Sequence, residues 1–140
     1  MKATVLADNI ADKGLKSEWG LSVFIHHEDK RILLDTGAGE KFALNAEKLG
    51  IPIKKVDFGV LSHAHYDHAN GMDTFFSLNS KAKFYVSSNC KENCYGKRWI
   101  FSKYIGIKRG VLEAYKDRIV YVKGDKVISE GVRILYHKTK

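Results

Sequence analysis

The sequence is poor in cysteine, with only Cys90 and Cys94 among its 140 residues. One pair cannot supply the four ligands of a zinc ribbon, and its spacing is not the Cys-x-x-Cys of redox enzymes. We therefore expect both thiols to be reduced and unligated.

Long apolar runs are also absent. No stretch approaches the roughly eighteen apolar residues of a membrane-spanning helix, and no basic-apolar-small leader opens the chain. The composition, 44% hydrophobic and 29% charged, is that of an ordinary soluble domain. These absences predict a single domain over residues 1–140, without a membrane partner and with the cytoplasm as its default location.

Acidic residues are outnumbered, with 16 Asp and Glu against 24 Lys and Arg, so the formal net charge is +8. Such a balance attracts phosphates, nucleic acid or acidic membranes. The basic residues are spread out, without a compact arginine cluster or interleaved stacking aromatics, which favours a solvated face over nucleic-acid binding. An anionic small-molecule substrate is compatible with this charge.

Histidine, in contrast, is concentrated in His63-Ala64-His65-Tyr66-Asp67-His68. Residues 56–62 before it predict a short apolar strand. Successive side chains alternate along a strand, so His63 and His65 should leave its end pointing the same way. The apolar spacing after Gly71 predicts a turn into a helix, which would aim Asp67 and His68 back at the strand end.

This cluster predicts an open, catalytic metal centre with His63, His65, Asp67 and His68 as ligands. Imidazole nitrogen and carboxylate oxygen are ligands of zinc, iron and manganese. The alternative is that surface or core histidines are gathered by chance. Buried polar groups without partners are costly, and a metal ion would give all four groups a partner at once.

A second polar residue, Asp35, ends the apolar segment Leu33-Leu34 and precedes Thr36-Gly37. In a histidine site, a carboxylate accepts the imidazole N–H that faces away from the metal. Asp35 is thus a candidate outer partner of a liganding histidine. The alternative is that it caps the following helix, predicted over residues 40–49.

These motifs resemble those of the metallo-β-lactamase superfamily. Residues 63–68 match its HxHxDH motif, and Asp35-Thr36-Gly37 matches its strand-end Asp-Thr-Gly. The stretch from Gly20 to Asn70, with Trp19-Gly20-Leu21-Ser22 at its start, is most similar to the branch of dihydropterin-ribofuranosylaminobenzene-phosphate synthase-like proteins. The resemblance also favours the outer-partner role for Asp35.

The resemblance implies an α/β (α+β) fold, the four-layer αββα sandwich of that superfamily. Since it covers the first half of the family pattern or slightly more, we expect a truncated domain, with the first half of the sandwich and the start of the second sheet. A sandwich cut in this way exposes an apolar sheet face, which predicts association, for example as a homodimer.

The resemblance also implies a metal-dependent hydrolase. His63 and His65 would hold a first metal and Asp67 and His68 a second, with zinc expected and iron or manganese as alternatives. A metal-bound hydroxide would attack an ester, a phosphoester or a related small substrate. Asp67 would be the catalytic residue, because it can orient the nucleophile or accept its proton.

In the family, three further ligands lie beyond the part of the pattern that this chain matches: a third histidine, a bridging aspartate and a last histidine. His137 lacks the small residues that surround the family's third histidine, so we do not assign that role to it. The alternative function is therefore a catalytically incomplete half-fold that binds metal weakly, acts as an interaction module or is completed by a second chain.

The remaining pattern predicts a hairpin of residues 19–27 and 31–35, with His26 and His27 facing solvent beside its turn. No clean period is found over residues 90–108, where Tyr95, Trp99, Phe101 and Tyr104 either line a pocket or pack. Other elements are predicted as strands at 3–6, 83–86, 118–122, 126–129 and 132–136, and as helices at 71–78 and 111–116.

Overall fold

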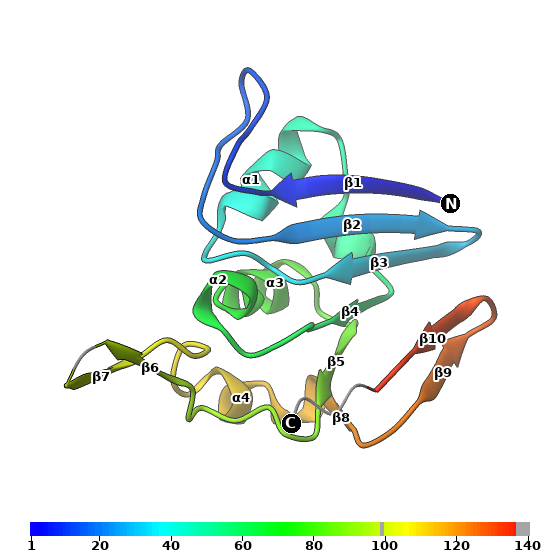
Figure 1. The fold of residues 1–140 in the computed structure, drawn as a ribbon. Helices are drawn as coiled ribbons and strands as arrows, with labels where there is room; N and C mark the ends of the chain where they lie inside the picture. The colour runs from blue at the N-terminus through cyan, green and yellow to red at the C-terminus, as the bar shows by residue number, and fades with distance from the viewer. Residues whose placement is uncertain (99, 137–140) are drawn as a thin grey trace.

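The computed structural model describes residues 1–98 and 100–136. Within them, six strands form one mixed sheet in the order β1-β2-β3-β4-β5-β8 (Figure 1). These strands are β1 (Lys2–Ala7), β2 (Ser22–His27), β3 (Lys30–Leu34), β4 (Phe58–Val60), β5 (Lys83–Ser87) and β8 (Ile119–Val122).

Helices and two hairpins complete the described fold. The helices are α1 (Lys41–Lys48), α2 (Tyr66–Ala69), α3 (Met72–Leu78) and α4 (Val111–Ala114), with 3₁₀ turns η1 (Ile53–Lys55) and η2 (Lys116–Arg118). The hairpins are β6 (Tyr95–Arg98) with β7 (Phe101–Tyr104), and β9 (Lys126–Ser129) with β10 (Val132–Ile134). In this part of the chain no helix is both long and apolar enough to cross a membrane.

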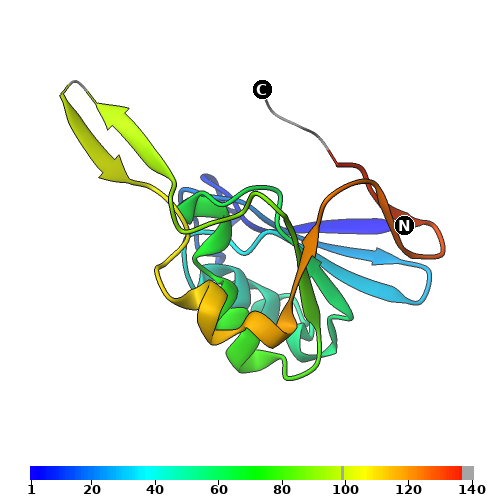
Figure 2. The same ribbon diagram turned by 90° about the horizontal axis from the view of Figure 1, so that it is seen from below.

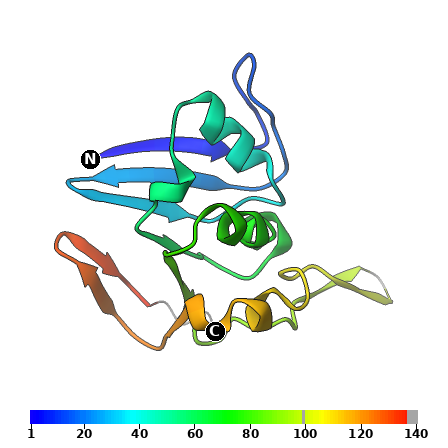
Figure 3. The same ribbon diagram turned by 180° about the vertical axis from the view of Figure 1, so that it is seen from behind.

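The sheet combines two kinds of pairing. β1, β2 and β3 pair antiparallel, whereas β3, β4, β5 and β8 pair parallel. Parallel neighbours need crossover connections, which here run through α1, through α2 and α3, and through α4. Figures 2 and 3 show these helices gathered on one face of the sheet. The predicted mixed α/β architecture is confirmed.

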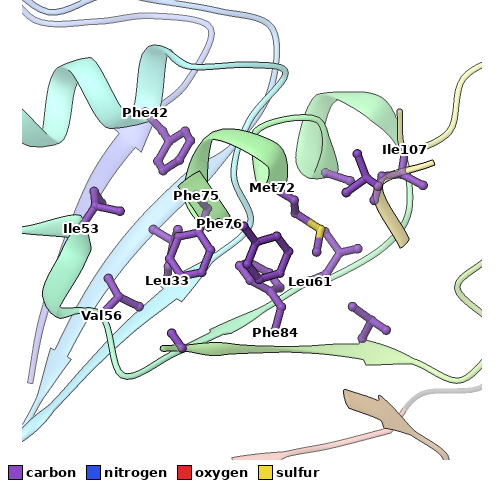
Figure 4. Close-up of a cluster of buried hydrophobic side chains, with 14 of the residues drawn as sticks. Leu33, Phe42, Ile53, Val56, Leu61, Met72, Phe75, Phe76, Phe84 and Ile107 are labelled. Carbon is purple, nitrogen blue, oxygen red and sulfur yellow. The ribbon is translucent and has the colours of Figure 1, made fainter. Parts of the chain in front are cut away.

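The main core lies between that face and the helices (Figure 4). The residue row Phe24, Leu33, Gly59 and Phe84 crosses four strands on this face. Phe75 of α3 meets the Phe84 ring edge to face, with ring centroids 5.2 Å apart. Alternation of side chains along each strand therefore directs these apolar positions at the helices.

The opposite face is apolar too. The paired row Val5, Val23, Leu34, Val60 and Tyr85 runs across it. The β9–β10 hairpin reaches this face, because the ammonium of Lys126 lies 5.5 Å from the centroid of the Tyr85 ring. Val5 at the edge strand is half exposed.

Most predicted elements are present, with shifted bounds. The strand predicted at residues 56–62 is shortened to β4, because residues 53–55 form η1 and Val56 caps it. The segment 90–108, which showed no period, contains the β6–β7 hairpin. His26 is exposed as predicted, but His27 is only partly exposed.

Strands β6 and β7, together with Ile100, form a projecting arm (Figures 1 and 2). The Tyr95 and Tyr104 rings pack edge to face across it at 5.3 Å, whereas Phe101 is 74% exposed. Trp99 and His137 lie outside the described residues.

Gly59 gives a test of the core. A Cβ there would lie 2.1 Å from the Phe84 ring, so Gly59→Ala should overpack the core and lower the free energy of unfolding by about 1–3 kcal/mol. Gly124→Ala is the control, since its Cβ would meet nothing within 4 Å and should change stability little. Urea unfolding of both variants measures this difference, and equal stabilities would contradict the packing.

Candidate metal centre

The histidine motif lies where β4 leaves the sheet. Leu61 still donates its backbone N–H to Tyr85 of the neighbouring strand. His65, the residue that starts α2, has an extended backbone with φ −74° and ψ 149°. The His63 and His65 rings lie edge to face with centroids 4.7 Å apart, close together as the strand-end spacing predicted.

Three of the four predicted ligands converge. Ligand atoms of His63, Asp67 and His68 all lie within 4.8 Å of one another. The His63 and His68 ring centroids are 4.1 Å apart, and His68 Nε2 lies 3.9 Å from Asp67 Oδ2. His65 lies beside this group without belonging to it. The one-turn helix α2 makes the convergence, because it turns Asp67 and His68 back toward the end of the strand.

Asp35 lies behind this cluster and is 1% exposed. Its Oδ2 lies 2.8 Å from His68 Nδ1 and accepts the Ser62 hydroxyl at 2.6 Å, while its Oδ1 accepts the Ser62 backbone N–H at 2.7 Å. Helix α1 starts after Glu40 and has no side-chain cap, so the Asp35 carboxylate does not cap that helix. A hydrogen bond from His68 Nδ1 leaves Nε2 as the atom available to a metal.

Ser62 is the residue that sequence reasoning missed. Its Oγ lies 2.9 Å from His63 Nδ1 as well as donating to Asp35. Because the hydroxyl proton of Ser62 is directed at Asp35, its Oγ acts as an acceptor toward His63. The proton in that contact is then on His63 Nδ1, which leaves His63 Nε2 unprotonated. Its position directly before the first histidine was the only signal in the sequence.

The backbone around α2 is held by two loops. The backbone N–H and the hydroxyl of Thr36 both donate to the His68 carbonyl, at 2.8 and 3.0 Å. Leu21 donates to the Asp67 carbonyl at 3.2 Å. Gly20 has φ +148°, and a Cβ there would lie 2.2 Å from that same carbonyl oxygen. The Asp-Thr-Gly and Trp-Gly-Leu segments thus fix the position of both residues.

The electrostatics favour neutral imidazole at the first ligand. Burial lowers the pKa of His63, and the neighbouring His68 and His65 lower it further. A lowered pKa favours the neutral imidazole, which is the form that binds metal.

A mixed α/β sheet with a His and Asp cluster at the end of a central parallel strand defines an α/β domain with a candidate transition-metal site. The family model of the metallo-beta-lactamase superfamily matches residues 20–139. The chain belongs to that superfamily.

Two relatives come from Methanocaldococcus jannaschii. An uncharacterized protein is 40% identical over 73 residues, which cover 49% of this chain and 27% of the relative. The 7,8-dihydropterin-6-methyl-4-(beta-D-ribofuranosyl)-aminobenzene-5'-phosphate synthase is 41% identical over 61 residues, or 40% of this chain and 21% of the relative. The chain therefore spans about a quarter of the length of these relatives.

Among solved structures, Tm1679, a metal-dependent hydrolase of the beta-lactamase superfamily, is similar over 95% of this chain and 46% of its own, with a TM-score of 0.68 and 28% identity. The metallo-beta-lactamase SMB-1 matches 92% of this chain and 49% of its own at 15% identity and a TM-score of 0.56, which shows the fold alone. The predicted superfamily fold is confirmed.

Replacing Asp35 tests its link to the metal ligands. In Asp35→Asn, an amide N–H₂ replaces one acceptor oxygen, so the side chain can no longer accept both from the Ser62 backbone N–H and from the Ser62 hydroxyl and His68 Nδ1. We expect zinc affinity to fall about 10–100-fold. Competition with a chromophoric chelator measures the affinity. Ser62→Ala is the control, since it keeps the Asp35–His68 contact and should lose less; unchanged affinity in Asp35→Asn would refute the link.

Proposed function

We propose that the chain is the metal-binding half of a hydrolase that acts on an ester, a phosphoester or a related small substrate. The convergence of His63, Asp67 and His68, with both imidazoles tied to Asp35, is the observation that carries this proposal. Superfamily membership supports it, because that superfamily includes the metal-dependent hydrolase Tm1679.

The donor set fits a transition metal. Two imidazole nitrogens and a carboxylate oxygen suit zinc, which is the expected ion, with iron or manganese as alternatives. His65 is the fourth proposed ligand, and its ring lies near His63. When bound, such an ion lowers the pKa of a coordinated water toward ~7.

The side chains of the chain have distinct proposed roles. Asp67, 18% exposed, is the proposed catalytic residue, which orients the nucleophile or accepts its proton. Asp35 holds His68 in the tautomer that presents Nε2, and through Ser62 does the same for His63. These contacts keep both imidazoles oriented before any ligand binds.

An anionic substrate suits the charge of the chain. The formal net charge is +8, so the surrounding field attracts phosphate groups. The name of the M. jannaschii synthase includes a 5'-phosphate compound, and that relative is 41% identical over the matched residues. We therefore place a phosphate-bearing small molecule first among candidate substrates, and the cytoplasm remains the proposed location.

A second candidate is a half-fold that binds metal without catalysis, or one that a second chain completes. A catalytic zinc ordinarily takes three protein ligands plus water, and two metals need more donors than the four proposed here. Within the described residues, only three donors form the close group. The alignment covers 46% of Tm1679, so other segments could supply the remaining ligands.

Metal content tests the ligand assignment. The double variant His63→Ala, His65→Ala should lose most of its bound zinc, because it removes two of the four proposed donors. Elemental analysis of purified protein measures the metal per chain. His26→Ala is the control, since His26 is exposed at the far end of β2 and should leave the content unchanged. Equal metal in the double variant would refute the site.

Activity separates the two candidate functions. If the missing donors are required, the zinc-loaded chain should hydrolyse a chromogenic phosphodiester or ester poorly, with a rate near that of zinc in buffer. A monodisperse monomer with a substantial rate that His65→Ala abolishes would show that this chain alone forms a complete centre. That outcome would favour the hydrolase over the half-fold.

A further inference from the structure

The β6–β7 arm presents an apolar tip and cations to solvent. Ile100 and Phe101 at its turn are 90% and 74% exposed, and Lys97 and Lys103 on its strands are also exposed. A single exposed apolar residue is ordinary, but two adjacent ones on a projecting hairpin flanked by lysines are typical of a contact surface.

The two faces of the arm differ. Tyr95 pairs with Tyr104 on one face, where the Arg109 guanidinium stacks on the Tyr104 ring at 4.4 Å and donates to the Tyr95 hydroxyl at 2.8 Å. Phe101 and Lys103 are two residues apart, so both lie on the other face. The first face is thus braced by contacts within the chain, while the second presents an aromatic ring and a cation to solvent.

A groove on the helical side of the molecule has complementary properties. It measures about 660 Å³ and lies between α1, α3 and the η1 turn. Most of its lining is apolar, including Leu44 and Ile53. Its charged groups are the carboxylates of Glu40, just before α1, and Glu47, within α1, and one cation, Lys54. Leu78 is 48% exposed there.

The charges on α1 are sorted between its two sides. Lys41 donates to the Ser17 carbonyl at 2.8 Å, and Lys48 donates to the Gly14 carbonyl, so both lysines are turned to the loop between β1 and β2. Glu40 and Glu47 line the groove instead. A chain with a net charge of +8 therefore presents a net acidic rim around its apolar groove.

We propose that the groove binds the arm of a second copy of this chain. Phe101 would enter the apolar groove, and Lys103 would pair with Glu40 or Glu47 on its rim. Phe101 and Lys103 are about 7 Å apart along the strand, and the two glutamates are about 10 Å apart along α1, so one cation can reach the rim while the ring fills the groove.

The arm cannot serve its own groove, because it projects away from α1 and α3 (Figure 2). The contact joins two different surfaces, so the mass rises without limit unless the rotation between copies closes a ring, of which a dimer with two reciprocal contacts is the smallest. The base of the arm is hydrogen-bonded to the loop that carries the candidate metal ligands: Ile107 donates to the Ala64 carbonyl, and Tyr66 donates to the Ile105 carbonyl. Docking of the arm would therefore also act on this loop.

Sedimentation equilibrium over a range of protein concentrations tests the proposal. The average mass of the native chain should rise with concentration. Phe101→Ser should weaken association at least about tenfold, as for a buried aromatic anchor. Ile10→Ser is its control, since Ile10 is 86% exposed outside the arm and the groove, and it should associate like the native chain.

A charge exchange identifies the two surfaces. Lys103→Glu alone should weaken association about two- to fivefold, as should Glu40→Lys or Glu47→Lys at the paired position. Combining Lys103→Glu with the matching glutamate variant should restore it, whereas Lys123→Glu, outside both surfaces, should have little effect. Failure of both combinations to restore association would overturn the pairing.

Three other results would overturn the proposal as a whole. One is a mass that stays that of a single chain at every concentration. Another is association that persists in Phe101→Ser but is lost in Val5→Asp, which would place the contact on the open sheet face. The third is a monomer that sediments with phosphatidylserine vesicles only while Phe101 is present, which would make the arm a lipid contact. Metal content is measured in parallel, so a failure of the metal site is recognised separately.

Discussion

The structure of the candidate metal centre depends on one buried carboxylate. Asp35 accepts two hydrogen bonds from Ser62 and lies in contact with His68 Nδ1. It is 1% exposed, so the cost of removing its charge from water must be offset by these contacts. Its backbone has φ +55°, an uncommon conformation for a non-glycine residue, which the surrounding loops hold in place. The orientation of both imidazoles follows from this single group.

The topology explains why the parts of this centre meet. β3 and β4 are parallel neighbours, so their carboxyl ends lie at the same edge of the sheet. Asp35 leaves β3 at that edge and Ser62 follows β4. The one-turn helix α2 then returns Asp67 and His68 to the same place, and the Thr36 and Leu21 backbone bonds fix it there. Residues distant in sequence meet because the crossovers that follow β3 and β4 begin side by side at this edge.

Much of this arrangement could be predicted from the sequence, because local signals carried it. The hairpin, the helix α1 and the HxHxDH motif each have a short-range pattern, and the Asp-Thr-Gly motif identified Asp35. What could not be predicted depends on contacts across the sheet. Ser62 has no pattern of its own, and its role appears only when Asp35 and His63 lie on either side of it. The β6–β7 hairpin was not predicted, because Tyr95 and Tyr104 make contact only once the two strands pair. The outer residues of the hairpin face solvent and so show no apolar alternation.

The chain as a whole is basic, whereas the candidate metal centre contains two carboxylates, and these two charges act over different distances. A chain with a net charge of +8 would repel a divalent cation if its charge were uniform. Screening at physiological ionic strength limits the reach of surface lysines to about 8 Å, so the local groups decide. Locally, the carboxylates of Asp35 and Asp67 lie beside His68, and the lowered pKa of His63 favours its neutral form, so the groups around the candidate site favour a cation. A metal cation is therefore compatible with this basic chain, because the groups within reach of the candidate site, and not the net charge, set the local potential.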